Sequence, residues 1–457
     1  MKKSKVSISA LSLLSVDIVV AIAFYIPDAS DLFAFLEALR PYNMLGPLEI
    51  LLELDQQLDR SSFLWPTLRL PVPLGPWSFS YESIAKFYST VAISNLNEMA
   101  WLKTHLHPKA KLAWFLDEFP ATMDILDDYW AGRITQLSVC LRGDSISSTT
   151  KVLHRLHNLV SLEVYDSPNI NLHDDELRQY HAAWDDIFEL AAKSNHLVEL
   201  KISPEFHSML ALNTEDLIDW FDRQPVRVFE CTWGDWLAID FDLKQELYQA
   251  MFNCPTMDTL RLNCCRFRDV DFSQLTFSMR SMQFKNCFSD TNFITQLATR
   301  LKGSSVVELE FSDYRDDSVD GLECLLQVLP QTSIIRLKMD GLPFQSLNLH
   351  ALLPLLENCT LKSLSLLGEN FSSAFANALA ASLQNNKTIC ELNLYCRDIA
   401  IADMRLLIQS MRDPSRGMLS KTIHLKISHL DTLDALALET LLKYAAHCGI
   451  CLTDLNL

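Results

Sequence analysis

A short apolar pattern recurs along the last two thirds of the chain, and it constrains the fold more than any other feature. The pattern is an apolar residue, two residues of any kind, a second apolar residue, one residue of any kind, and a third apolar residue. The central apolar residues of its occurrences are Leu137, Leu162, Leu200, Phe229, Leu260, Met282, Leu309, Leu337, Leu364, Leu392, Leu425 and Leu455. Their mean spacing of about 29 residues predicts a repeated structural unit.

Each occurrence predicts a short strand, because its last two apolar residues alternate with another residue at period two. Helical spacing follows many of these strands, most clearly in two sets: Met404, Leu407, Ile408 and Met411, and Leu438, Leu441, Leu442 and Ala445. Asp242 and Gln245 form a capping-box-like start for a further helix. A strand and a helix in so few residues cannot bury their apolar sides alone, so the units must stack. We therefore expect an α/β solenoid over residues 131–457, with a parallel sheet on the concave face and helices on the convex face.

This array resembles the leucine-rich-repeat family, and its period and helical outer face are most similar to the ribonuclease-inhibitor-like branch. The family places an Asn or Cys three residues beyond the last strand position. Cys265 and Cys287 match that position. The resemblance implies a protein-binding surface.

The first 59 residues predict a small all-α module. Ile18, Ile22, Tyr25 and Ile26 form one helical stripe, and Leu32, Phe35, Leu36 and Leu39 form another. Ser30 is a suitable N-cap for the second helix, with Asp31 in its first turn. A third helix is indicated by Leu51, Leu54 and Leu58.

This module resembles an F-box in its order of Leu14, Asp17, a helix over 18–26, and Asp31-Leu32. Ser15 stands where that family has Pro, and the segment 37–40 replaces the family's cysteine and tryptophan tail. The resemblance implies that the module docks a Skp-type adaptor of a cullin ubiquitin ligase, while the repeats hold a protein target. The implied adaptor-docking residues are Leu14, Asp17, Ile18, Ile22, Ile26, Leu32, Phe35 and Leu36.

Residues 60–130 carry neither pattern clearly. Four prolines between Trp65 and Trp77 interrupt the segment, and apolar helical pieces are expected around 84–96 and 112–126. A solenoid needs its first unit covered, so this segment is expected to connect the module to the repeats and cap them.

Composition narrows the function. The formal net charge of −18 repels phosphate backbones, so no nucleic-acid partner is expected. Only 11 glycines are available for loops that cradle phosphates, and no P-loop, nucleophile elbow or zinc motif occurs. We expect no catalytic residues, no cofactor and no metal. The twelve scattered cysteines indicate buried, reduced thiols and a cytoplasmic or nuclear protein without a membrane partner.

Two alternatives stay open. One is a plain interaction scaffold, in which the N-terminal helices only cap the repeats. The other is a secreted or surface receptor, because three lysines precede an apolar stretch over 6–27 that has the form of a signal peptide interrupted by Asp17. Asn358, Asn370 and Asn386 would be its glycosylation acceptors.

Polar residues beside the apolar strand positions would line the concave face and bind the target. The candidates are Tyr165, Arg261, Gln283, Lys285, Arg336, Lys338 and Tyr395. The four basic residues among them would form a stripe across neighbouring strands, which favours an acidic partner.

Overall fold

A computed structural model of the chain divides into two compact units, residues 1–180 and 181–457. The structure describes residues 15–58, 61–71, 74–75, 78–94, 99–116, 126–141, 146–166, 174–204, 210–211, 213–232, 234–235, 239–266, 269–287, 292–312, 319–340, 353–367, 372–395, 399–413, 416, 423–427 and 435–454. Leu14 and Asn370 lie outside these ranges.

The first unit begins with the expected helices, α1 (Val16–Ala23), α2 (Ala29–Leu39), α3 (Leu48–Leu58) and the short α4 (Ser61–Leu64), with a 3-10 turn, η2, at Arg40–Tyr42. The hydroxyl of Ser15 accepts from the backbone N–H of Ile18 and caps α1, and Asp17 lies in the first turn, where a carboxylate is favourable. The α2 cap is Asp28 rather than Ser30. The carboxylate of Asp28 accepts from the backbone N–H of Asp31 at 3.1 Å, and the Ser30 hydroxyl donates to it at 2.5 Å.

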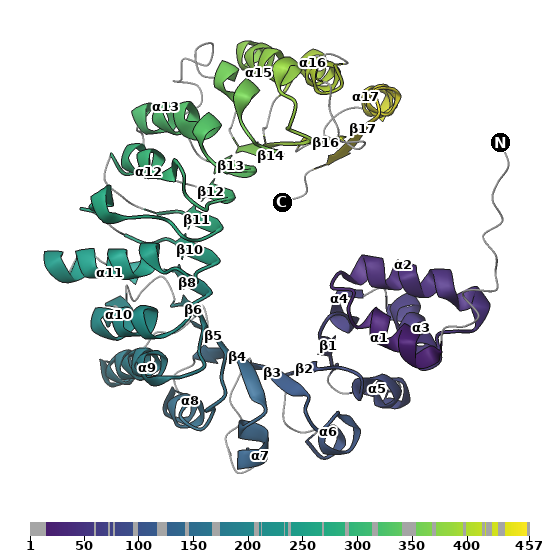
Figure 1. Cartoon of the computed structure of the whole chain (residues 1–457), viewed down its shortest axis with the longest axis vertical. Coiled ribbons are helices and arrows are strands. Elements are labelled where there is room, and N and C mark those ends of the chain that lie inside the picture. The colour runs from purple at the N-terminus through teal and green to yellow at the C-terminus, as the bar shows by residue number, and fades with distance from the viewer. Residues whose placement is uncertain are drawn as a thin grey trace. The chain divides into compact units, whose positions relative to one another are not determined.

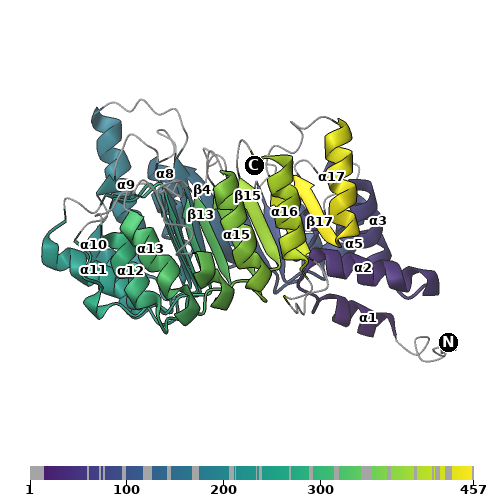
Figure 2. The same cartoon turned by 90° about the horizontal axis from the view of Figure 1, so that it is seen from above.

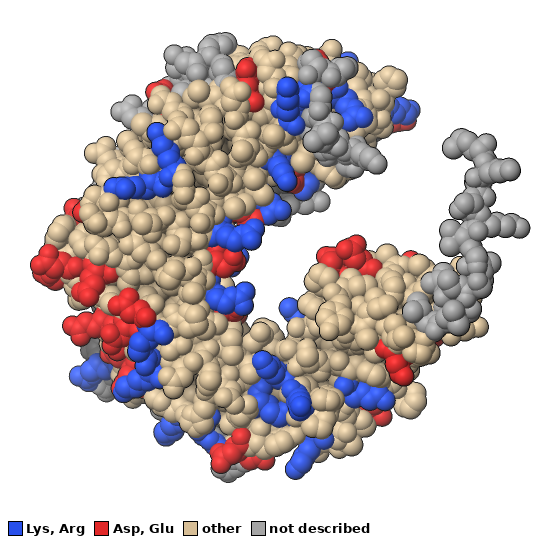
Figure 3. Space-filling model, in the orientation of Figure 1, with Lys and Arg blue, Asp and Glu red and all other residues tan. Residues whose placement is uncertain are grey.

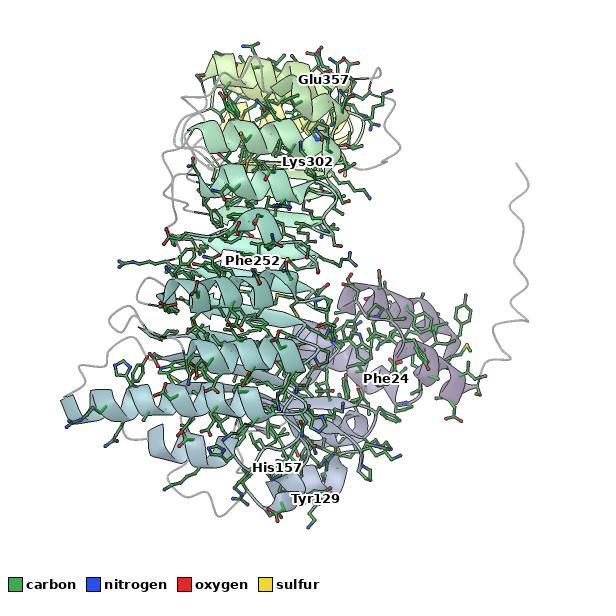
Figure 4. The ribbon with its side chains drawn as sticks, turned by 60° about the vertical axis from the view of Figure 1, so that its left-hand side comes forward. Phe24, Tyr129, His157, Phe252, Lys302 and Glu357 are labelled. Atoms are coloured by element: carbon green, nitrogen blue, oxygen red, sulfur yellow. The ribbon has the colours of Figure 1, made fainter. Side chains whose placement is uncertain are left out.

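An aromatic cluster fixes the chain where α1 ends. Figure 4 shows Phe24 within the N-terminal helical module. Its ring meets Trp65 edge-on at 5.0 Å between centroids and Tyr88 at 5.6 Å. The Tyr88 hydroxyl donates to the carbonyl of Leu64 at 2.6 Å. These contacts link α1 to the segment that follows α4, so the helices and the first strands form one body.

The segment 60–130 differs from the expected helical cap, because three parallel strands run through it. They are β1 (Leu68–Arg69), β2 (Thr90–Ile93) and β3 (Lys111–Leu116). The expected helix over 112–126 therefore begins as a strand. The repeat pattern does reach this segment, in Trp65, Leu68 and Leu70 and again in Tyr88, Val91 and Ile93, all of them buried. These two occurrences are more closely spaced than the mean repeat, and prolines interrupt the chain around the first of them, so the sequence pattern there was not recognised as part of the array.

The remaining elements of the first unit are α5 (Ser78–Ala85), α6 (Met99–His105), α7 (Asp128–Ala131), β4 (Ile134–Leu141), α8 (Ile146–Leu153) and β5 (Ser161–Asp166). Strands β1 to β5 pair in parallel and in sequence order, as strands separated by helical crossovers must. Helix α9 (Asp174–Lys193) runs across the division between the units.

The second unit contains the other strands of the expected array in unbroken parallel order (Figure 1). They are β6 (Glu199–Ser203), β8 (Val228–Thr232), β10 (Thr259–Asn263), β11 (Ser281–Lys285), β12 (Glu308–Ser312), β13 (Arg336–Asp340), β14 (Ser363–Leu367), β15 (Glu391–Tyr395), β16 (Ile423–Ile427) and β17 (Ile450–Asp454). With β4 and β5 of the first unit, eleven of the twelve predicted strands are present as expected. In the twelfth, β17, Leu452 rather than the predicted Leu455 pairs with Leu425, and Leu455 lies outside the described residues. Equivalent pattern positions are paired, as in Leu260 with Met282 and Leu337 with Leu364, so the repeat period sets the strand register.

Helices of the second unit lie along one side of its strands (Figure 2). They are α10 (Thr214–Arg223), α11 (Phe241–Asn253), α12 (Phe293–Leu301), α13 (Val319–Val328), α15 (Ser373–Asn385), α16 (Ile401–Met411) and α17 (Ala435–His447), with 3-10 turns η5 (Phe272–Gln274), η6 (Leu329–Gln331) and η8 (Leu353–Asn358). A separate two-stranded sheet pairs β7 (Leu210–Ala211) with β9 (Gly234–Asp235). The α11 cap is Asp240, two residues before the expected Asp242. Gln245 bonds instead to the backbone of Asp269 and Asp271.

Buried thiols within the array donate to backbone carbonyls of neighbouring strands. The thiol of Cys265 donates to the carbonyl of Cys231 at 3.2 Å, and that of Cys287 donates to Leu262 at 3.2 Å. Both cysteines are buried, and burial raises the pKa of Cys287 well above its usual value. The thiol of Cys287 is therefore protonated at neutral pH, and both buried cysteines serve packing.

Candidate functional site

The outward face of α1 is apolar. Ile18 and Ile22 are 46% and 40% exposed, and Tyr25, just beyond the helix, is 89% exposed. These three residues follow one another at helical spacing, so they form one surface, here named the α1 apolar face. Exposed apolar residues that gather on one face mark an interaction site more often than residues scattered singly.

This face points outward because the opposite side of α1 packs into the core of the module. Val19 and Ala23 are buried, and the apolar residues of α2 that face inward, Leu32 and Leu36, are fully buried. A Cβ added at Gly46 would lie 2.4 Å from the nearest methyl of Val16, so α1 also rests closely on the loop before α3. The fold therefore leaves the α1 apolar face at the surface of the module and does not bury it in the core.

The predicted adaptor-docking residues differ in how exposed their side chains are. Asp17, Ile18 and Ile22 are exposed, whereas Ile26 and Phe35 are half-buried. Leu32 and Leu36 lie in the core of the module and can contribute only by holding the helices in place. Tyr25 was left out of the predicted set, although its place in the helical stripe was a signal for including it.

A second candidate surface is the face of the second unit's sheet that carries no helices, here named the open face. Arg261 of β10, Gln283 of β11, Glu310 of β12 and Lys338 of β13 occupy the same register position on successive strands. These side chains line a hollow of about 240 Å³ together with Arg336. Lys285 lies at the end of β11 on the same face and is exposed. The structure therefore brings five of the predicted target-binding residues together.

The other two predicted residues are placed differently. Tyr165 belongs to β5 of the first unit, opposite Cys140 of β4. Tyr395 ends β15, where its backbone pairs with Leu367, and its side chain is outside what the structure describes.

Charges on the open face alternate and do not form the expected basic stripe. Arg261 ion-pairs with Glu230 at 3.3 Å, Lys338 pairs with Glu310 at 2.6 Å, and Arg336 pairs with Glu308. A fourth pair joins Lys426 to Glu391 at 3.0 Å. Figure 3 shows the resulting neighbouring basic and acidic side chains near β10 to β13. The predicted basic stripe did not take into account the glutamates at the equivalent positions one repeat earlier.

The pKa values of Glu310 and Glu391 show how burial and hydrogen bonding compete at two of these ion pairs. Burial raises the pKa of Glu310, but hydrogen bonds from Lys338 and Ser312 outweigh it and leave the pKa below its usual value. Burial likewise raises the pKa of Glu391, and bonds from Lys426 and Ser363 lower it by more. Both carboxylates are therefore charged at neutral pH, and the open face offers fixed pairs of opposite charge.

No group of three or more His, Cys, Asp or Glu among the described residues could hold a metal ion. No helix in the same part of the chain is long and apolar enough to span a membrane.

Comparisons with known proteins add little to this geometry. No family model and no curated protein matches the chain. Among solved structures, an internalin of Listeria monocytogenes matches 77% of this chain and 83% of its own, with 12% identical residues and a TM-score of 0.36. The fold class rests on the strands and helices themselves. Their parallel register, one-sided helix layer and repeat length define an α/β leucine-rich-repeat architecture.

Proposed function

We propose that this protein is the target-recognition subunit of a cullin-type ubiquitin ligase. In this proposal the helical module binds a Skp-type adaptor, and the repeats bind a protein target. The observation that carries it is the α1 apolar face, which the fold leaves exposed on a module whose helix order resembles an F-box. Catalysis of ubiquitin transfer would lie in other subunits.

The exposed side chains of α1 support a direct contact with the adaptor. Fully burying an isoleucine side chain that starts fully exposed is worth about 1.5–3 kcal/mol. Ile18 and Ile22 are 46% and 40% exposed, so each contributes less than this, and Tyr25, which is 89% exposed, offers further contact on the same face. Leu32 and Leu36 act indirectly, because they hold α2 beneath α1.

Co-purification of the adaptor and cullin with the full chain tests the proposal. Ile22→Asp places a charge on the α1 apolar face and is expected to lower adaptor affinity at least about tenfold. Ala38→Asp adds the same charge at an exposed position of α2 and serves as the control. Recovery of no adaptor by the wild-type chain, or equal recovery by the wild type and Ile22→Asp, contradicts the ligase role and leaves the scaffold hypothesis.

The receptor hypothesis now has fewer glycosylation acceptors to rely on. Asn386 is fully buried, and its amide bonds to the carbonyl of Leu356 at 2.6 Å and to the backbone N–H of Ile389 at 2.7 Å. A glycan there would remove these contacts, so Asn386 is not an acceptor in the folded protein. Asn358 is exposed, and a glycan found on it would support the receptor hypothesis.

A further inference from the structure

A pocket of about 540 Å³ lies in the first unit between the N-terminal helices and the strands β1 to β3. Its lining is mostly apolar, and Leu58, Phe63, Leu70, Ile93 and Phe115 supply much of it. Pockets that hold small ligands or peptide side chains occupy about 300–1,000 Å³. The hollow is therefore large enough for more than one apolar side chain of a partner.

Arg69 is the one charged side chain among the described residues that line this pocket. Its guanidinium carbon lies 5.3 Å from the centre of the Phe63 ring and 5.8 Å from that of Phe115. Such stacking orients a guanidinium while leaving its N–H groups free to donate. Among the described residues, no carboxylate pairs with Arg69, in contrast to the paired cations of the open face.

The sequence creates this hollow by placing a small residue beside the arginine. Arg69 of β1 pairs in register with Ala92 of β2, which pairs with Ala113 of β3. At the corresponding positions of β10 to β13 the side chains are long and polar, and they fill the face. Ala92 leaves a small apolar floor, while Phe63 and Phe115 lie at its sides, 41% and 39% exposed.

We propose that this pocket binds an acidic, apolar segment of a protein target, with a target carboxylate on Arg69 and an adjacent apolar side chain between Phe63 and Phe115. The proposal rests on the target-recognition role inferred above and names a site for it, but it requires no adaptor. Charge complementarity selects the carboxylate, because the guanidinium is the single charge among the described residues of a mostly apolar lining. Arginine and aromatic residues in one pocket are also the composition of binding hot spots.

Exposure favours a protein segment over a small free acid. Sites for small molecules enclose most of the ligand surface, commonly about 70–90%. Here Phe63, Arg69 and Phe115 are all exposed, so a bound group stays open to solvent on that side. An extended segment can cover these side chains while it places one side chain in the hollow.

The test uses the purified full chain and two fluorescein-labelled peptides, Ser-Glu-Phe-Asp-Leu-Glu-Ser and its amide counterpart Ser-Gln-Phe-Asn-Leu-Gln-Ser. Fluorescence anisotropy is measured up to about 1 mM protein, where contacts of this strength are detectable. The acidic peptide is expected to bind at least about tenfold more tightly than the amide peptide, which is the size of one charge-assisted hydrogen bond. Arg69→Gln should reduce the affinity for the acidic peptide to that for the amide peptide, and Phe115→Ala should weaken both.

Lys111→Gln is the matched control. Lys111 is an exposed residue of the same strand as Phe115 and lies on the same face, so its loss changes the net charge equally without altering the pocket. Equal affinities of the wild type for the two peptides, no binding of either, or equal losses in Arg69→Gln and Lys111→Gln would overturn the proposal. Binding of 3-phenylpropanoate as tightly as the acidic peptide would also overturn it, because a small acid would then suffice.

The adaptor experiment separates this proposal from the ligase role. Arg69→Gln should recover as much adaptor as the wild type. If the wild-type chain binds no adaptor but still prefers the acidic peptide, the ligase role alone is refuted. Retained adaptor binding without peptide selectivity would refute the pocket alone.

Discussion

The indole N–H of Trp65 donates to the backbone carbonyl of Ile26 at 2.8 Å, across 39 positions of sequence. Ile26 follows α1, and Trp65 opens the first occurrence of the repeat pattern. The contact therefore holds the end of the helix that carries the α1 apolar face against the start of the strand array. A docking helix held in this way needs no ordering when a partner arrives.

Trp65→Phe tests this contact. The variant keeps an aromatic ring beside Phe24 and Tyr88 but leaves the carbonyl of Ile26 without its donor. We expect the free energy of unfolding to fall by about 1–3 kcal/mol, measured by chemical denaturation. Phe79→Leu, at a position that is 75% exposed, is the control and should change it by less than about 0.5 kcal/mol. Equal stability of Trp65→Phe and wild type would show that the bond contributes nothing.

Gly46 permits the close approach of α1 to the loop before α3. Its φ is +54°, and an added Cβ would lie 2.4 Å from Val16. Gly46→Ala therefore carries a left-handed backbone cost of about 1–2 kcal/mol and also pushes against α1. We expect lower thermal stability and weaker adaptor recovery. Gly75→Ala has a similar positive φ but open space around it, so it should lose stability without losing adaptor.

The repeat array could be predicted because residues one repeat apart in the sequence pair with each other in adjacent strands. Leu260 pairs with Met282, and Leu337 with Leu364, at positions that the apolar pattern had already aligned. The three strands in 60–130 were not predicted because the spacing of the pattern there is shorter than the mean repeat and because prolines interrupt the chain around the first strand. Trp65 and Tyr88 were the available signals, since each is the first apolar position of an occurrence.

Site residues were harder to predict than the fold, because exposure and charge pairing depend on neighbouring repeats. Arg261 and Lys338 lie on the open face, where Glu230 and Glu310 neutralise them from the preceding strands. Leu32 and Leu36 have the same character in sequence as Ile18 and Ile22. Only the packing of α2 shows that the first pair is core and the second is surface.

Arg416 stabilises the end of the array from within. It is 1% exposed and donates to the carbonyls of Asn386 at 2.6 Å, Ile389 at 2.7 Å and Met411. Burial lowers its pKa to about 10, so the guanidinium is still charged at neutral pH. Arg416→Met would leave these buried carbonyls unsatisfied and should cost on the order of 3 kcal/mol. Arg412→Met, which removes a charge from a partly exposed neighbour, is the control, and hydrogen exchange of α15 and α16 locates the loss.

The carboxylates of the open face predict a dependence of stability on pH. The pKa of Glu310 is lowered from an ordinary value of 4.5 despite burial, which raises it, because Lys338 and Ser312 bond to the charged form. A carboxyl group with a lower pKa in the folded state stabilises the protein fully above its unfolded value. That stability is lost as the pH falls through the lower, folded value. At pH 7 we expect Glu310→Gln to be less stable than the wild type by under about 1 kcal/mol, since Lys338 is 38% exposed and the pair is screened.

The difference between Glu310→Gln and the wild type should shrink as the pH is taken below 4.5, because the wild-type carboxyl is then progressively neutral as well. Denaturation midpoints measured from pH 7 to acid give this difference directly. Glu357→Gln, whose carboxylate lies on the helix side at η8 and makes no ion pair with a described residue, is the matched control. Glu357→Gln shows the effect of removing one carboxylate without breaking an ion pair of the open face. A Glu310→Gln difference that stays constant from pH 7 to acid would show that the ion pair with Lys338 contributes nothing to folding.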